Sequence, residues 1–112
     1  MNTTASSSAQ IVNSASSRCS PISEFFNPNI TTGGPTGTDF FFWGVTAGCR
    51  NTGSGCVISR TNSGVDTMVL EDGGTSVIVT DNISAAAQAS SIYFSNLGSP
   101  RRAFKLTQSG LQ

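Results

Sequence analysis

From residue 39 onward the chain alternates between short apolar runs and clusters of glycine, asparagine, aspartate and serine. In the first run every second residue from Phe41 to Cys49 is apolar, which is the period of a strand with one buried face. The turn residues recur too often to leave room for long helices. This pattern predicts a mainly β fold, with about six strands in three hairpins that form an antiparallel sheet or a sandwich.

The first 18 residues differ from the rest. A chain of 112 residues is the size of one domain, so we divide it into a polar arm or helix at 1–18 and a single β-rich domain at 19–112. Within the arm, Ile11 and Val12 belong to an apolar stripe with helical spacing. A short amphipathic helix docked on a partner surface is one interpretation, which would make the fold α+β, and disorder is the other.

Cys49 and Cys56 flank the turn of the first predicted hairpin. Residues opposed across two strands lie within disulfide range, so a disulfide between them is one interpretation. The other is that both are small buried side chains in a reduced protein. Cys19 is the odd cysteine. Because the chain has no histidine and no Cys-x-x-Cys pair, we expect no metal site built on these cysteines.

Phe40 and Phe42 lie on the face of the first strand opposite to the apolar alternation. Two large side chains on that face need another layer or another subunit over them. We therefore name Phe40 and Phe42 as interface candidates together with Ile11 and Val12, and expect a partner or the N-terminal segment to cover the two phenylalanines.

A second hairpin is predicted over residues 66–81, with Gly73 and Gly74 as its loop. This register matches apolar residues across the strands: Leu70 with Val77, Val69 with Ile78, and Met68 with Val79. It also places Asp66 opposite Asp81. Two like charges there are splayed into solvent or are bridged by a cation such as calcium, so this pair is the one metal hypothesis that the sequence offers.

A third hairpin is predicted near the C-terminus, after a short turn or loose crossover at 82–90. Its strands point four apolar side chains inward and leave Tyr93 outward: the inward residues are Ile92, Phe94, Phe104 and Leu106.

The only basic cluster lies in this hairpin and consists of Arg101, Arg102 and Lys105. Three cations contact phosphates weakly and in a strongly salt-dependent way, so we do not expect a nucleic-acid partner. A solvated strand end or a salt bridge between subunits is the more ordinary role.

Composition bears on function mainly by exclusion. Without histidine, nucleophilic mechanisms of the Ser-His and Cys-His kind are excluded, and we predict no enzyme activity and no cofactor. The net charge is zero and only 11% of residues are charged, a polar surface that is common in extracellular and virion proteins. The longest apolar stretch, Phe40 to Val45, is far shorter than the roughly 20 residues of a membrane span.

The run from Phe94 to Pro100 has the form Phe-x-x-Leu-Gly-x-Pro, and a strand at 103–107 and Gly110 follow it. This segment resembles the last hairpin of type IV pilin-like and pseudopilin proteins. The resemblance implies a non-catalytic structural subunit of a bacterial surface filament, extracellular or at the cell surface, which assembles with copies of itself or with homologous subunits. It also implies that the stripe at 5–15 is the distal half of a pilin helix, although the cleavage motif and apolar helix half of a pilin are not in this sequence.

Two other functions remain open. A phage or viral structural protein, such as a capsid decoration or tail component, would begin at a native Met1 and use its polar arm to bind neighbours. A small extracellular ligand-binding or adhesion module would use exposed aromatic residues such as Trp43 and Tyr93. The start of the native reading frame distinguishes the pilin-like interpretation from the virion one.

Overall fold

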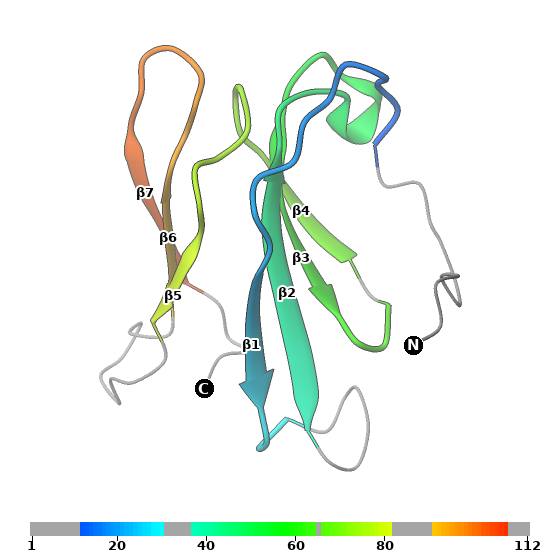
Figure 1. Cartoon of the computed structure of the whole chain (residues 1–112), viewed down its shortest axis with the longest axis vertical. Coiled ribbons are helices and arrows are strands. Elements are labelled where there is room, and N and C mark those ends of the chain that lie inside the picture. The colour runs from blue at the N-terminus through cyan, green and yellow to red at the C-terminus, as the bar shows by residue number, and fades with distance from the viewer. Residues whose placement is uncertain (1–11, 31–36, 65, 82–90, 108–112) are drawn as a thin grey trace.

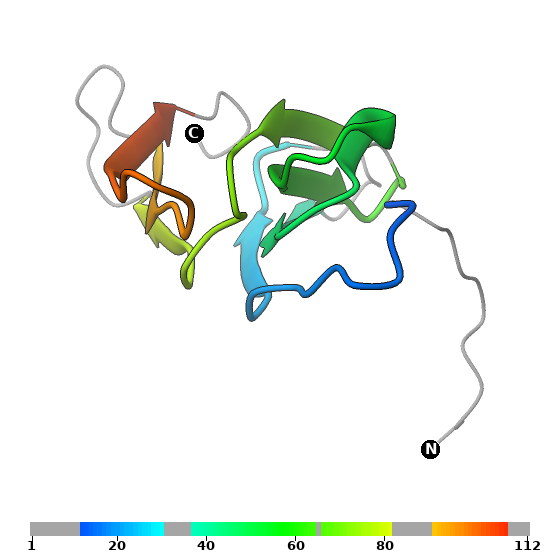
Figure 2. The same cartoon turned by 90° about the horizontal axis from the view of Figure 1, so that it is seen from above.

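A computed structural model describes residues 12–30, 37–64, 66–81 and 91–107 (Figure 1). Its seven strands form two antiparallel sheets, with the orders β1-β2-β3-β4 and β5-β6-β7. The two sheets lie side by side, and Figure 2 shows the chain passing from one to the other after β4. The elements are β1 (Ser23–Asn27), β2 (Thr38–Val45), the 3-10 turn η1 (Cys49–Asn51), β3 (Cys56–Thr61), β4 (Asp66–Leu70), β5 (Val79–Asp81), β6 (Ser91–Ser95) and β7 (Ala103–Thr107).

The hairpin of β2 and β3 confirms the first predicted hairpin. Its register pairs Trp43 with Ile58 and Val45 with Cys56, so the apolar alternation of the two strands falls on one face. These four residues and Cys49 form a buried cluster. Val12 packs against this cluster from the N-terminal side. The segment around Val12 therefore contributes to the domain core.

The opposite face of β2 packs against the second sheet. Phe42 is completely buried in a cluster with Val57, Ile78, Ile92 and Phe94, and Phe40 is partly buried against the same cluster. The prediction that a partner or the N-terminal segment covers this face is therefore wrong. The chain supplies the second layer itself, because Ile78, just before β5, and Ile92 and Phe94 of β6 pack against Phe42.

The predicted hairpin of residues 66–81 is also wrong. β4 pairs with β3, so that Val69 lies opposite Val57, and β5 pairs with β6 in the other sheet. Gly73 and Gly74 both have positive φ, 70° and 74°, and at these residues the chain leaves the first sheet. A β carbon on Gly74 would lie 2.8 Å from the carbonyl of Val45, so only glycine fits this crossing.

The two aspartates of the metal hypothesis are consequently far apart in the topology. Asp66 lies in β4, where its Oδ1 is 2.8 Å from Nε of Arg60. Asp81 lies in β5 and pairs with Ser91. The facing pair that motivated a calcium site therefore does not exist in this fold.

Pro21, Pro28 and the run Gly33-Gly34-Pro35 predict an irregular connection over residues 20–38, but β1 lies within this segment. It pairs with β2, placing Phe25 opposite Phe40. Farther along, Cys19 pairs with Val45, and four residue steps from Cys19 to Ser23 oppose only three from Phe42 to Val45. This one-residue excess is a β-bulge, which bends the chain out of the sheet near Pro21.

The described part of the N-terminal arm is not helical. Residues 12–18 contain only a turn at 15–16. Thr46 N–H donates to the Arg18 carbonyl at 2.9 Å, so the segment joins the sheet through its backbone. The helix prediction is therefore wrong over these residues, and Ile11 and the rest of 1–11 lie outside the described residues.

The hairpin of β6 and β7 confirms the third predicted hairpin. Its inward side chains are those expected: Ile92 and Phe94 are buried, and the Phe94 and Phe104 rings stack at 5.5 Å with Leu106 against the same core. Tyr93 is exposed on the other side. The predicted turn or crossover at 82–90 lies outside the described residues.

Candidate interaction site

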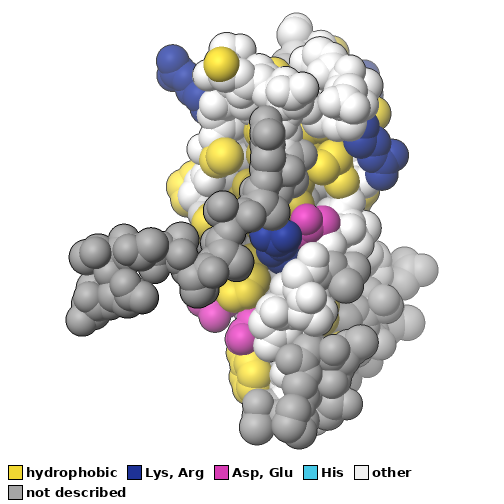
Figure 3. Space-filling view, turned by 90° about the vertical axis from the view of Figure 1, so that its right-hand side faces the viewer, with side chains coloured by type: hydrophobic (Ala, Val, Ile, Leu, Met, Phe, Trp, Pro, Cys, Tyr) yellow, Lys and Arg dark blue, Asp and Glu magenta, His cyan; other side chains and the backbone are white. Residues whose placement is uncertain are grey.

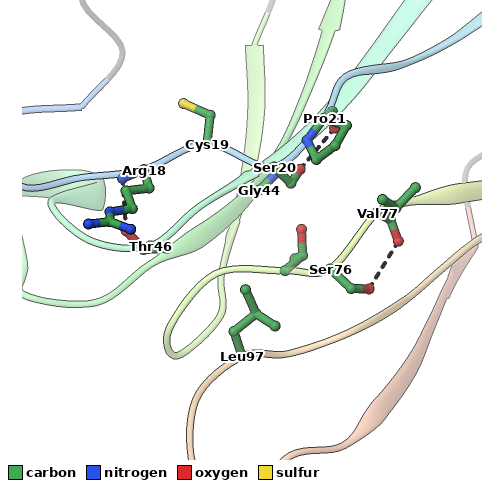
Figure 4. A pocket seen from close by; sticks show the side chains of 10 residues that line it. Arg18, Cys19, Ser20, Pro21, Gly44, Thr46, Ser76, Val77 and Leu97 are labelled. Carbon is green, nitrogen blue, oxygen red and sulfur yellow. Dashed lines mark hydrogen bonds between the residues drawn. The ribbon is translucent and has the colours of Figure 1, made fainter.

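A cavity of about 330 Å³ lies where the two sheets separate at one end (Figure 4). Its size is at the low end for ligand pockets, enough for one or two side chains of a partner. Four stretches that are distant in sequence form it: the N-terminal segment, the end of β2, the connection before β5, and the turn after β6. The lining residues are Arg18, Cys19, Ser20, Pro21, Gly44, Thr46, Thr75, Ser76, Val77 and Leu97.

The first wall is held in place by Ser20. Its backbone N–H donates to the Gly44 carbonyl at 2.9 Å, and its Oγ accepts from the Gly44 N–H at 2.8 Å. The same hydroxyl donates to the Pro21 carbonyl at 2.9 Å. At the bulge, the serine side chain thus replaces the backbone acceptor that a regular strand would offer, and the wall stays attached to β2.

The floor combines Gly44 with Thr75. A β carbon on Gly44 would lie 2.0 Å from Thr75 Oγ1, so the two sheets approach closely here only because residue 44 is glycine. Thr75 is 3% exposed, and its hydroxyl has no hydrogen-bond partner among the described residues. A buried hydroxyl without a partner costs stability, which sets Thr75 apart from the satisfied polar groups around it.

Replacing Thr75 with valine is expected to raise the free energy of unfolding by about 1 kcal/mol, since a buried unpartnered hydroxyl costs about 1 to 3 kcal/mol and the added methyl group must still fit beside Gly44. The matched control is Thr46→Val. Thr46 Oγ1 accepts from the Arg18 N–H at 2.9 Å, so this change is expected to lower stability by about 1 kcal/mol. Denaturant titration measures both, and equal losses in the two variants would contradict the assignment.

The mouth of the cavity is apolar. Val77 is 54% exposed and Leu97 is 48% exposed, and both line the opening. The Ser76 hydroxyl is already hydrogen-bonded within the chain. Its Oγ accepts from the Ser95 N–H and donates to the Val77 carbonyl, both at 3.0 Å. Exposed apolar side chains around a concave site are typical of a surface that contacts another protein.

Cys19 is the free cysteine of the described chain and is exposed beside this mouth. The other two form a disulfide, with a Cα–Cα distance of 6.0 Å. Both disulfide cysteines are fully buried. Of the two interpretations open for the first hairpin, the disulfide is therefore correct.

The disulfide holds η1 against the end of the first sheet. Arg50, at the centre of η1, has a positive φ of 51°, and its Nη2 donates to the Met68 carbonyl at 2.8 Å. The loop thereby places a guanidinium on the edge of β4. Nothing in the sequence pattern indicates this contact, because it depends on the left-handed backbone at Arg50.

The basic cluster stays on the surface. Arg101 and Arg102 are exposed in the turn between β6 and β7, and Lys105 is exposed on β7 with its Nζ 5.8 Å from the Tyr93 ring centroid. The structure thus keeps these three residues on one hairpin, whereas the other interface candidates are divided. Phe40 and Phe42 belong to the core between the sheets, and Val12 packs against the disulfide side.

Sequence reasoning missed the cavity. Its lining comes from four segments, and their proximity depends on the crossing between the sheets, where the sequence predicted a hairpin. Within the described ranges, no three cysteine, aspartate or glutamate side chains are grouped to hold a metal ion. Those ranges also contain no helix long and apolar enough to cross a bilayer.

Comparison with known proteins gives no relative for this chain: no protein-family model, curated protein or solved structure matches it.

Proposed function

We propose that this chain is a non-catalytic structural subunit of a bacterial surface filament, similar in role to a minor pilin or pseudopilin. The observation that carries the proposal is the cavity with exposed Val77 and Leu97 at its mouth. An apolar surface of this kind is stabilised when a neighbouring subunit removes it from water. The resemblance of the last hairpin to pilin-like proteins supplies the kind of assembly.

Two further features support an assembly outside the reducing cytoplasm. The disulfide between Cys49 and Cys56 is compatible with an extracellular protein, because such bonds persist in oxidising compartments. Only 11% of the residues are charged, and Figure 3 shows the Lys, Arg, Asp and Glu side chains of one face as small separate patches. The absence of a helix at 12–18 means that the proposal rests on the hairpin and the surface, and not on a pilin helix.

A ligand-binding module is less well supported. That alternative relied on exposed Trp43 and Tyr93 as aromatic contacts. Trp43 is only 9% exposed and belongs to the buried cluster behind the disulfide. Trp43 is therefore part of the core and does not form an exposed contact for a ligand.

The proposal predicts that Val77→Asp lowers the share of the chain found in assembled surface material by about tenfold, because a carboxylate at an apolar contact is left desolvated. Val79→Asp is the matched control. Val79 is also exposed, at 60%, and begins β5 two residues after Val77, but it does not line the cavity.

The measurement uses cells that make the chain natively. Surface material is sheared off and sedimented, and immunoblotting gives the share of each variant in the pellet. Equal shares of the two variants in the pellet would show that the cavity does not contribute to assembly. Recovery of the wild-type chain in purified virus particles, and not in sheared filaments, would support the virion alternative instead.

A further inference from the structure

Two segments of the sequence each contain charges of a single sign. Segment 66–72 contains three acidic residues and no basic one, whereas segment 101–107 contains three basic residues and no acidic one. Each segment includes an edge strand: β4 ends the first sheet and β7 ends the second. The acidic residues are Asp66, Glu71 and Asp72, and the basic ones are Arg101, Arg102 and Lys105.

Among the described residues, no strand pairs with the outer edge of β7. Asn96 N–H donates to the Arg102 carbonyl at 3.0 Å, which makes these two a hydrogen-bonded pair of the β6–β7 ladder. Because hydrogen-bonded and non-hydrogen-bonded pairs alternate, the N–H and C=O groups of Ala103, Lys105 and Thr107 point away from β6. No hydrogen bond from a described residue to these groups is present.

The outer edge of β4 follows from the same alternation. Asn62 N–H donates to the Asp39 carbonyl, so residues 57 and 59 of β3 direct their backbone groups to β4. Their partners on β4 are 69 and 67, which leaves the backbone groups of Asp66, Met68 and Leu70 on the open edge. The contact of Arg50 with the Met68 carbonyl agrees with this assignment.

We propose that β7 of one copy pairs antiparallel with β4 of a second copy. This inference rests on the proposed function and names the contact through which the subunits join. In the proposed register every outward-facing residue of β7 meets an outward-facing residue of β4. The pairs are Ala103 with Leu70, Lys105 with Met68, and Thr107 with Asp66 of the second copy.

The charges select this register and direction. Continuing the antiparallel pairing by one step places Arg102 opposite Glu71 of the second copy. Asp72 lies beyond β4 in the turn, where its carbonyl accepts from the Gly98 N–H of its own chain at 3.1 Å. A parallel arrangement would separate Arg102 from Glu71. Opposite charges across a strand pair stabilise the pairing, and the backbone hydrogen bonds supply most of the affinity.

The contact does not close on itself. β4 ends the first sheet and β7 ends the second, so the two edges are different surfaces of the molecule (Figure 1). A head-to-tail contact between different surfaces therefore leaves a free β4 at one end and a free β7 at the other. Such contacts generate an open fibre unless the rotation between copies closes a ring.

Arg50 protects the β4 edge in the single subunit. Its guanidinium occupies the Met68 carbonyl, which is the acceptor that Lys105 N–H of the neighbouring copy requires. Proteins commonly block exposed edge strands with such charged groups. Assembly then requires the exposed Arg50 side chain to move aside.

The test uses two proline variants of the purified full-length chain. Lys105→Pro removes an outward N–H without removing a β6–β7 hydrogen bond, and Leu70→Pro does the same on β4. Each is expected to weaken self-association about tenfold or more in sedimentation velocity. Lys105→Thr and Leu70→Thr keep the N–H and are the matched controls, and circular dichroism verifies that all four variants fold.

Mixing the two proline variants gives the decisive result. One retains an intact β4 and the other an intact β7, so an equimolar mixture is expected to form a dimer that grows no further. A mixture that stays monomeric, or proline variants that associate like their threonine controls, would overturn the pairing. Arg50→Asn removes the guanidinium from the Met68 carbonyl and keeps a residue that tolerates positive φ. This variant is expected to self-associate about fivefold more tightly than the wild type.

Failure of this contact is distinguishable from failure of the proposed function. If Lys105→Pro enters sheared surface filaments as well as Lys105→Thr does, the strand pairing is wrong while the filament role stands. If the wild-type chain is absent from filaments, the filament role fails whatever the proline variants do in solution.

Discussion

Replacing Phe42 with alanine is expected to lower the free energy of unfolding by about 3 to 5 kcal/mol. Phe42 is fully buried between the two sheets, against Val57 and Ile92 among others. Its removal leaves a cavity that the surrounding strands fill only in part. Since a domain of this size is stable by about 5 to 15 kcal/mol, the variant should unfold at a much lower denaturant concentration or fail to fold at all.

The matched control is Phe26→Ala. Phe26 lies in the same sheet but is 47% exposed, so its loss should cost about 1 kcal/mol or less. Both variants are compared with the wild type by urea titration at two protein concentrations. A loss at Phe42 that disappears on dilution would mean that a partner copy, and not the chain's own second sheet, covers this side chain.

Removing the disulfide is expected to lower the free energy of unfolding by about 2 to 3 kcal/mol, from the entropy that the closed loop withholds from the unfolded chain. Cys49 and Cys56 are seven positions apart and both are fully buried. Alanine at both positions avoids burying new hydroxyl groups. The change should also release Arg50 from the edge of β4, because η1 begins at Cys49.

Cys19→Ser is the control for the disulfide prediction. Cys19 is exposed and free, so this variant should keep wild-type stability within about 0.5 kcal/mol. Urea titration of the two variants under non-reducing conditions gives the comparison. A double alanine variant as stable as the wild type would show that the loop is held by packing and by the Arg50 contact alone.

Alternation was sufficient to predict the hairpins β2–β3 and β6–β7. In both cases one face of each strand is consistently apolar, so local pattern and tertiary packing favour the same register. The disulfide followed as one of two interpretations because Cys49 and Cys56 flank such a turn. The inward set from Ile92 to Leu106 was identified for the same reason.

The apolar alternation predicted the wrong strand pairing where the chain passes from the first sheet to the second. Residues 66–81 read as a hairpin, yet β4 obtains its partner from β3 and β5 obtains its partner from β6. The positive φ of Gly73 and Gly74 fits a tight hairpin loop as well as a crossing. Only the close approach of Gly74 to Val45 distinguishes them, and that contact is invisible in the sequence.

β1 and the cavity were missed for a related reason. Pro21 and Pro28 flank β1, and prolines predict an irregular connection. A strand at the edge of a sheet nevertheless tolerates prolines next to it. The lining of the cavity, Gly44 and Thr75 above all, depends on how the two sheets separate. No local spacing predicts that geometry.

The most direct test of the account is the size of the complex that holds this chain in the cells that make it. Gentle release of surface material, followed by sedimentation and mass spectrometry, should find the chain in polymers that contain many copies or homologous subunits. Recovery of the wild-type chain only as a free monomer would contradict the assembly role.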